Sequence, residues 1–247
     1  MKDRFDIDEF LELKRRWEAF RFTHGRKPKY IRTKDGEEIP QCIFDDMILR
    51  YENFVKKYNR RPRVVSILSD KWIRTGFWKQ DKQDTGYTCG PSSLQMALSA
   101  LGCTVKEDIL KKAAGTTKQG TSHEGMLRAI QYAAGKCKAQ LNGRFIYFKS
   151  FGWAGLISGI KRGCEYVIHL KPLPSLKTDY RGRDVWKSFQ GGHYVYLVGV
   201  NPTDKLVAIA DPTKGLQVFT VKQMENAMSG VSKESILEIC KKYRRYG

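Results

Sequence analysis

The segment from Gln83 to Gly102 restricts the fold more than any other, because it places a cysteine at the start of a helix. It begins Gln-Asp-Thr-Gly-Tyr-Thr-Cys-Gly-Pro and continues with apolar residues at helical spacing until Gly102. Pro91 suits the first turn of a helix, so Cys89 is predicted at the helix N-terminus. Unpaired backbone N–H groups and the helix dipole stabilise a thiolate there. We therefore interpret Cys89 as a candidate nucleophile.

A glutamine upstream of this cysteine is a candidate oxyanion donor. Gln83 lies six residues before Cys89 and is predicted to direct its side-chain amide to the same point. Together with the backbone N–H of Cys89 it would stabilise the charge that develops on an attacked carbonyl. Gln80 is an alternative donor at a less suitable spacing. A buried structural cysteine is the other interpretation of Cys89, and the Gln-x5-Cys-Gly-Pro pattern favours the catalytic one.

A cysteine nucleophile needs a base and a group that orients the base, and both are often distant in sequence. His193 begins an apolar run that ends at Val200, and Asp211 ends a second run that begins at Leu206. Both runs predict strands. Neighbouring strands would bring His193 and Asp211 into contact, so that the acid fixes the imidazole tautomer. Asp204, in the predicted turn between the strands, is the weaker candidate for the acid.

The other histidines and the cysteines predict no metal site. His123 is expected in a helix cap and His169 as a structural residue of a strand. The six cysteines are spread along the chain without a CxxC pair, so we expect mainly reduced thiols and no zinc site. Motifs of nucleotide-binding and serine-hydrolase folds are absent from the sequence, and no cofactor is predicted. The polar connection over residues 173–190 has two interpretations, a rim of the cleft or a surface loop without a role.

The first 75 residues contain an internal repeat. A shift of 34 residues superposes Phe10 on Phe44, and the apolar spacing of each copy predicts a helix. A basic turn follows each helix, Gly25-Arg-Lys-Pro-Lys in one copy and Asn59-Arg-Arg-Pro-Arg in the other, and a short extended segment comes next. Gly25 and Asn59 suit a left-handed helix cap, and the proline ends the helix.

The repeated basic turns need an explanation beyond packing. Two amphipathic helices that pack on each other would account for the apolar residues of both copies. They would not account for the same dense positive charge at the same place in each copy. We interpret the turns as a repeated anion-binding edge. Its candidate residues are Arg26, Lys27, Lys29, Arg60, Arg61 and Arg63.

The positive charge extends over the whole chain. Residues 1–75 carry 19 basic and 13 acidic residues, a balance of +6, which leaves +13 of the total +19 for the rest. Such a field attracts a polyanion: nucleic acid, an anionic membrane face or an acidic cell-wall polymer. No apolar run is long enough for a transmembrane helix, and the charged start does not look like a signal peptide. We expect a protein made in the cytoplasm and not inserted into a membrane.

The basic turn followed by hydrophobic residues resembles the pseudomurein-binding repeat. This short module occurs in proteins that attach to the pseudomurein wall of certain methanogenic archaea. The resemblance covers about residues 8–73 and implies that this part binds the wall. We place the two copies at about residues 8–40 and 42–74.

The arrangement of cysteine, histidine and aspartate resembles papain-like cysteine peptidases of the double-glycine, bacteriocin-processing type. Within that superfamily it is similar to the pseudomurein endoisopeptidases. The resemblance spans about residues 78–235, with helices at 121–134 and near 151–162 and a strand at 166–170. It implies an α+β fold in which the helix bearing the cysteine packs on an antiparallel sheet bearing the histidine and the aspartate.

The resemblance also implies a role for each site residue and a substrate. Cys89 takes the place of the nucleophile, His193 of the base, Asp211 of the orienting acid and Gln83 of the oxyanion donor. The substrate would be the isopeptide bond between Ala and the Lys ε-amine of pseudomurein cross-links, cut at the wall by a lytic enzyme of a methanogen virus or provirus.

The sequence thus predicts a small, mainly helical repeat domain over residues 1–75 and a papain-like peptidase domain over residues 76–247. Pseudomurein is the expected partner, and nucleic acid is not. Two alternatives remain open. One is a double-glycine leader peptidase, which would not need wall-binding repeats. The other is a noncatalytic basic protein that binds a wall or nucleic acid, and the complete set of site residues argues against it.

Overall fold

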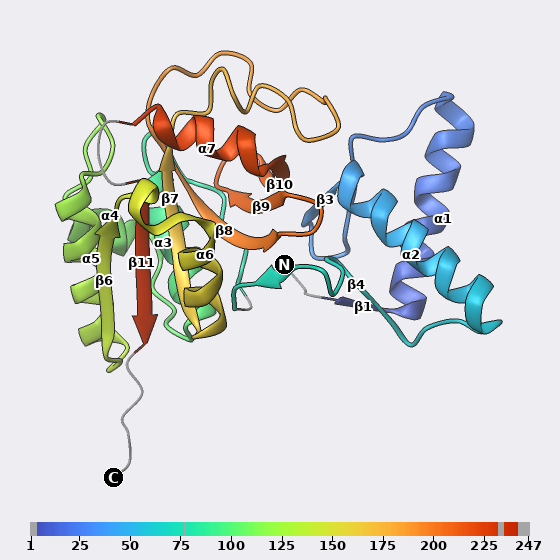
Figure 1. Ribbon diagram of the computed structural model, residues 1–247, viewed down its shortest axis with the longest axis horizontal. Coiled ribbons are helices and arrows are strands. Elements are labelled where there is room, and N and C mark those ends of the chain that lie inside the picture. Colours follow the sequence, from blue (N-terminus) through green and yellow to red (C-terminus); the bar gives the residue numbers. More distant parts are fainter. Residues whose placement is uncertain (1–3, 77, 232–234, 242–247) are drawn as a thin grey trace, which may run out of the picture. The chain divides into compact units, whose positions relative to one another are not determined.

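The computed structural model describes residues 4–76, 78–231 and 235–241, without the side chain of Cys42. It divides into two compact units, Met1–Trp72 and Ile73–Gly247 (Figure 1). Each unit has its own sheets and helices and is described separately below. No helix within the described ranges combines the length and the apolar character needed to cross a membrane.

The first unit consists of two β-α-β repeats. The first repeat contains β1 (Arg4–Asp6), α1 (Ile7–His24) and β2 (Tyr30–Arg32). The second contains β3 (Glu38–Pro40), α2 (Gln41–Tyr58) and β4 (Val64–Ser66). Every element of the second repeat begins 34 residues after its counterpart in the first. Gly25 and Asn59 end the two helices in the left-handed conformation, with φ values of 62° and 49°, which confirms the predicted caps.

The two repeats exchange their strands. β1 pairs antiparallel with β4, and β2 pairs antiparallel with β3, so neither repeat pairs its own two strands. Two backbone hydrogen bonds follow the same exchange: the Ile7 N–H donates to the Arg63 carbonyl, and the Gln41 N–H donates to the Lys29 carbonyl, both at 3.0 Å. The sequence pattern predicted the helices, turns and following extended segments but missed the strand before each helix. The two copies therefore complete each other, like the subunits of an isologous dimer.

The core of this unit lies between α1 and α2. Phe10 and Phe44 are fully buried, and Trp17 is 2% exposed. The Phe44 ring centroid lies 5.8 Å from that of Phe10 and 5.1 Å from that of Trp17. Large aromatic side chains in such contact contribute most of the burial available to a small unit. Since one ring comes from α2 and two from α1, the core belongs to both repeats.

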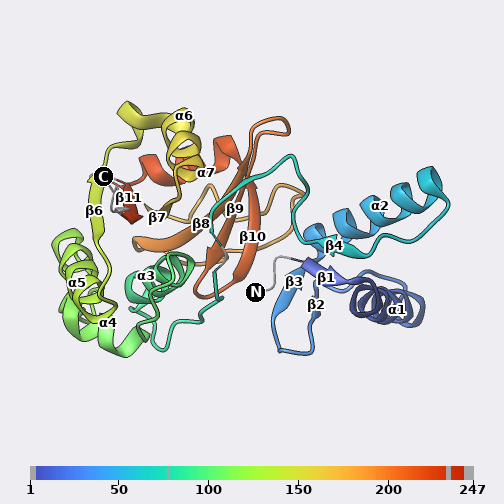
Figure 2. The ribbon, with the colours of Figure 1, turned by 90° about the horizontal axis from the view of Figure 1, so that it is seen from below.

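The second unit is a seven-stranded antiparallel sheet between two groups of helices. Its strands are β5 (Ile73–Arg74), β6 (Leu141–Ile146), β7 (Cys164–Leu170), β8 (His193–Asn201), β9 (Leu206–Asp211), β10 (Gly215–Thr220) and β11 (Ile236–Lys241). Its helices are α3 (Cys89–Ala100), α4 (Glu107–Ala114), α5 (His123–Lys136), α6 (Phe148–Lys161) and α7 (Val221–Ser229). The strand order is β10-β9-β8-β7-β11-β6, and β5 pairs with β8. Figure 2 shows α3, α4 and α5 on one side of the sheet and α6 and α7 on the other.

Strand β8 lies at the centre of this unit and is buried along its whole length. Both of its faces are covered, so it is a continuous apolar run rather than an alternating one. Val195 and Leu197 belong to the core formed with α6 and α7. On the opposite face the Ser93 hydroxyl of α3 donates to the Tyr194 carbonyl at 3.0 Å. The predicted α+β fold is confirmed, because the helix that begins with Cys89 packs on the antiparallel sheet.

Two disulfides correct the expectation of mainly reduced cysteines. Cys103 is joined to Cys137 and Cys164 to Cys240. Of the cysteines whose side chains the structure describes, Cys89 alone is free. The expectation was wrong because it rested on how thinly the cysteines are spread, whereas pairing depends on spatial proximity. Cys164 and Cys240 are 76 residues apart in sequence but directly opposite each other on β7 and β11.

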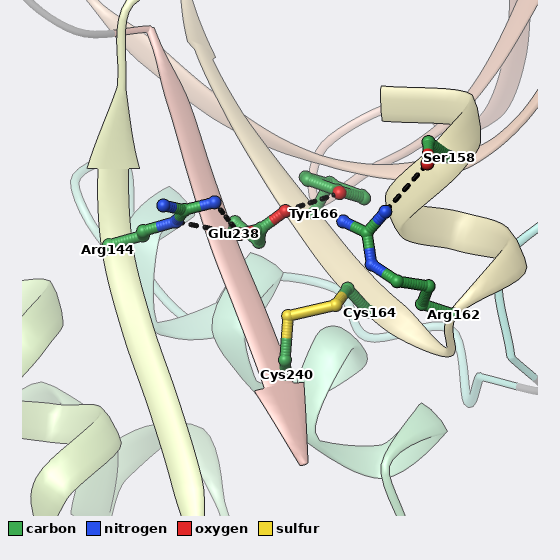
Figure 3. The surroundings of a disulfide bond; sticks show 7 residues. All are labelled: Arg144, Ser158, Arg162, Cys164, Tyr166, Glu238 and Cys240. Atoms are coloured by element: carbon green, nitrogen blue, oxygen red, sulfur yellow. Dashed lines mark hydrogen bonds and ion pairs between the residues drawn. A yellow bond between two sulfur atoms is a disulfide. The ribbon is translucent and has the colours of Figure 1, made fainter. Parts of the chain in front are cut away.

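A buried carboxylate lies beside the second disulfide (Figure 3). Glu238 accepts a hydrogen bond from the Tyr166 hydroxyl at 2.6 Å and one from the Arg144 guanidinium at 2.8 Å. Within the described residues, Glu238, Cys164 and Cys240 are the one group of three side chains close enough to share a metal ion. Both sulfurs of that group are joined to each other in the Cys164–Cys240 disulfide.

Candidate active site

Cys89 is the first residue of α3, and the residue is 8% exposed. Two serines in the first turns hold the start of this helix. The Ser92 hydroxyl donates to Asp81 Oδ2 at 2.7 Å, and the Ser93 hydroxyl donates to the backbone of β8. The thiol is therefore fixed against the sheet at a helix N-terminus, as the sequence pattern predicted.

His193 and Asp211 meet at one end of the hairpin that β8 and β9 form. β8 begins with His193 and β9 ends with Asp211, and the two strands are antiparallel neighbours. His193 Nε2 lies 3.2 Å from Asp211 Oδ1. Asp204 lies at the other end of this hairpin, where it pairs with Asn201 at 2.8 Å. The antiparallel geometry thus selects Asp211 and excludes Asp204 as the acid beside the imidazole.

Asp211 is 1% exposed and strongly hydrogen-bonded. Its Oδ1 accepts from the Thr213 N–H at 2.7 Å, the Thr213 hydroxyl at 2.8 Å and the Lys214 N–H at 3.1 Å. Burial acts to raise the pKa of Asp211, but attraction to His193 and these hydrogen bonds outweigh it and leave the pKa lowered. Asp211 is therefore ionised, and its orientation is held by the backbone of the following turn.

His193 carries the positive charge of the pair. Burial acts to lower the pKa of His193, but the Asp211 charge and the hydrogen bond and charge of Cys89 raise it to about 10. Since Nε2 faces Asp211, Nδ1 is the ring nitrogen left for the Cys89 thiol. The arrangement places an imidazolium beside the sulfur of Cys89, as catalysis by a cysteine nucleophile requires.

The connection between β7 and β8 covers the imidazole. Trp186 is 7% exposed and lies edge-on to the His193 ring at a centroid distance of 5.0 Å. Phe189 approaches the same ring at 6.0 Å, and the Lys214 ammonium lies 5.1 Å from the centre of the Trp186 ring. Of the two interpretations of this connection, the structure favours the one that places it at the site. A tryptophan within a polar segment was the sequence signal for it.

The two glutamines of the segment before α3 have different partners. The Gln83 N–H donates to the Pro212 carbonyl at 3.1 Å, which holds Gln83 beside the Asp211 end of β9. The Gln80 amide donates to the carbonyls of Asp81 at 2.9 Å and of Asp211 at 3.4 Å. Gln80 thus ties the segment to the sheet through its side chain. Gln83, whose amide donates to a carbonyl of its own loop, stays the predicted oxyanion donor.

The remaining histidines of this region form a separate cluster. His169 stacks on Tyr194 at 4.4 Å, and its Nδ1 lies 3.3 Å from His123 Nε2. Burial and the charges of His123 and His193 lower the pKa of His169 to about 4, so it is neutral near pH 7. His123 stacks on Phe145 at 3.8 Å and follows the N-cap residue of α5. Packing accounts for both histidines.

A cysteine at a helix N-terminus, an imidazolium beside it and a carboxylate on the adjacent antiparallel strand define a papain-like cysteine peptidase. The chain belongs to the Peptidase_C39-like family, whose model matches residues 76–236. No curated protein matches the chain.

Three solved peptidase structures are similar to this chain. The peptidase domain of Streptococcus ComA, a bifunctional ABC transporter involved in quorum sensing, is 17% identical over 67% of this chain and 98% of that one, with a TM-score of 0.45. A putative C39-like peptidase from Bacillus anthracis is 16% identical over 71% of this chain and 100% of that one, with a TM-score of 0.47. A double-glycine motif protease from an AMS/PCAT transporter, solved with its leader peptide, is 15% identical over 68% and 93%, with a TM-score of 0.44.

Iodoacetamide should label Cys89 first when no reductant is present. Cys103, Cys137, Cys164 and Cys240 are closed in disulfides, whereas Cys89 is free and has the His193 imidazolium beside it. Peptide mapping after a short reaction near neutral pH measures this. His193→Ala should slow the labelling roughly tenfold, because the ion pair is lost. Faster labelling of Cys42 would contradict the assignment.

Proposed function

We propose that this peptidase hydrolyses the isopeptide bond between Ala and the Lys ε-amine in pseudomurein cross-links, as a lytic enzyme of a methanogen virus or provirus. The observation that carries the proposal is the presence of a paired basic repeat unit in the same chain as the peptidase. A peptidase that cuts a free peptide has no need of such a unit. One that cuts an insoluble polymer gains effective concentration from a second binding site.

The basic turns of the two repeats have matching local structure, which supports a shared role. The Arg26 guanidinium lies 5.2 Å from the centre of the Phe20 ring, and Arg60 lies 5.2 Å from Phe54, its equivalent. These cation–π contacts hold both arginines against their helices while leaving them exposed. Lys27 is in addition paired with Asp45 at 3.0 Å. Lys29, Arg61 and Arg63 are also exposed, so each turn presents several positive charges to an anionic polymer.

The two disulfides agree with action outside the cytoplasm. Disulfides persist in oxidising surroundings and are rarer where thiols are kept reduced, intracellular proteins of hyperthermophiles excepted. A wall enzyme would work in the former conditions. Both disulfides lie in the peptidase unit, where Cys103–Cys137 joins the segment after α3 to the end of α5. We propose the cell wall as the place of action.

The site supports acyl transfer through a thioester. The Cys89 thiolate attacks the Ala carbonyl carbon, and the oxyanion accepts hydrogen bonds from the Gln83 amide and the Cys89 N–H. The His193 imidazolium gives its proton to the Lys ε-nitrogen as the C–N bond breaks. His193 then takes a proton from a water molecule as the water oxygen attacks the thioester carbon. Breaking of the C–S bond releases the Ala carboxyl group and restores the Cys89 thiolate beside the His193 imidazolium.

A double-glycine leader peptidase is the second candidate. Membership of the Peptidase_C39-like family agrees with it equally well. It would use the same site and the same acyl transfer on a peptide substrate. A leader peptidase would have no use for the repeat unit, so we place this function second.

Incubation with purified walls tests the proposal. We expect the protein, in buffer without reductant, to release Lys ε-amines from pseudomurein sacculi and none from bacterial murein sacculi. Cys89→Ala should sediment with pseudomurein and release nothing. Cleavage of a double-glycine leader peptide with intact pseudomurein would support the second candidate instead.

A further inference from the structure

Two carboxyl groups, the buried Glu107 and the half-buried Asp81, clamp the loop that carries Gln83. The Asp84 N–H donates to Glu107 Oε1 at 3.1 Å and to Oε2 at 3.3 Å. Asp81 accepts from the Ser92 hydroxyl of α3, and its side chain lies within hydrogen-bonding reach of that of Glu107. Glu107 is the first residue of α4 and is 5% exposed. The residues on either side of Gln83 are thus held by two different helices.

A hydrogen bond between two carboxyl groups requires a proton on one of them, because an ionised carboxylate only accepts. Burial and the charge of Asp81 raise the pKa of Glu107 to about 7, although hydrogen bonds from Thr88 and Asp84 oppose the rise. Burial and the charge of Asp84 likewise raise the pKa of Asp81. The groups that α3 turns toward the pair, Ser92 and Gln95, are uncharged. Below about pH 7, the pair therefore holds a proton that the two carboxyl groups can share.

We infer that Asp81 and Glu107 are positioning residues, which hold Gln83 in place while they share a proton and release its loop when the proton is lost. The inference rests on the peptidase activity and on the proposed role of Gln83. It does not depend on the wall substrate. Loss of the shared proton would leave two adjacent negative charges, one buried and one half-buried, and their repulsion favours an open loop.

The closed Gln83 loop should be more stable at low pH than at high pH, because the pKa of Glu107 is raised when the loop is closed. The pKa of Glu107 is about 7 with the loop closed, above that of an exposed glutamate, so the closed loop binds a proton that the open loop releases. Low pH therefore favours the closed loop, and its stability falls as the pH rises through about 7. The pKa of His193 is about 10, so the imidazolium persists across this range. Titration of His193 therefore does not produce a loss of activity between pH 7 and 9.

Hydrogen exchange of the Asp84 amide tests the inference without any substrate. Exchange of the full-length protein is measured from pH 6 to 9 and corrected for the intrinsic rate. In the wild type, protection of Asp84 should fall by up to about tenfold per pH unit above pH 7. In Glu107→Gln it should stay constant, because glutamine accepts from the Asp84 N–H and donates to Asp81 with no proton to lose. Constant protection in the wild type, or an equal fall in the variant, would overturn the inference.

Glu165→Gln is a matched control. Burial also raises the pKa of Glu165 to about 7, and this carboxyl accepts from the Gly76 N–H at 2.9 Å and from the Tyr196 hydroxyl. The substitution removes a buried carboxyl of the same pKa whose hydrogen-bond partners lie outside the Gln83 loop. The pH dependence of Asp84 protection should be the same as in the wild type.

A comparison of two reactions of Cys89 tests whether the loop holds Gln83 in position to stabilise the oxyanion. Alkylation by iodoacetamide forms no oxyanion, whereas turnover on pseudomurein passes through one. Glu107→Ala should lose roughly tenfold to a hundredfold in turnover, because Gln83 is misplaced, with the alkylation rate unchanged. An equal loss in both rates would contradict the positioning role. If the wild type cuts no wall material, the proposed function fails, and hydrogen exchange still decides the inference.

Discussion

His193→Ala should lose turnover by a factor on the order of 10⁴ or more, whereas Asp211→Asn should keep at least about tenfold more activity than His193→Ala. His193 both stabilises the thiolate and gives a proton to the leaving amine, so no other group replaces it. Asp211 orients the ring and raises the pKa of His193. Asparagine can still accept from the imidazole and from the Thr213 and Lys214 N–H groups that hold Asp211 in place.

Release of Lys ε-amines from pseudomurein by each variant measures the difference. Thermal unfolding of both variants serves as the control, because His193 and Asp211 are buried and either change can weaken the fold. Full activity of Asp211→Asn would place the orienting group elsewhere. Asp204 and Asn201 would not be the replacement, since they bond to each other at the far end of the hairpin.

Phe44→Ala should unfold the whole first unit and abolish sedimentation with pseudomurein. Removing a fully buried phenylalanine costs about 3 to 5 kcal/mol, which is comparable to the total stability of so small a unit. Because Phe44 packs against Phe10 and Trp17 of the other repeat, both copies should be lost together. Circular dichroism of the full-length protein on heating, together with a sedimentation assay, measures both effects.

Phe22→Ala is the matched control for that experiment. Phe22 is on α1 of the same unit but is 94% exposed, so its removal opens no cavity. Its variant should unfold and sediment like the wild type. Retention of wall binding by an unfolded Phe44→Ala unit would show that the repeats are not the wall-binding part.

The elements with long apolar patterns were predictable from the sequence. α3, β8 and β9 each have enough residues for their periodicity to show, and the order of cysteine, histidine and aspartate then placed the three side chains at one site. The structure brings His193 and Asp211 into contact, and Cys89 lies close enough to His193 to raise the pKa of the imidazole. Their catalytic roles, and that of Gln83, stay predictions that the variants above can test.

The features that escaped prediction depend on three-dimensional proximity. β1 and β3 have three residues each, too few for a period of two to be visible, and their partners lie in the other repeat. The Cys164–Cys240 disulfide closes a separation of 76 residues that only the sheet order makes short. Glu107 looks like an ordinary acid in the first turn of a helix. Its burial beside Asp81, which the sequence does not reveal, gives it a shared proton.

The strand exchange also limits how this chain can change length in evolution. Deleting one 34-residue copy by recombination would leave the surviving copy with two unpaired strands and half a core. Those open edges would have to pair with another molecule, which would turn a self-contained unit into part of a dimer or an aggregate. Gains and losses of the repeat are therefore expected in even numbers, with two copies as the smallest heritable module.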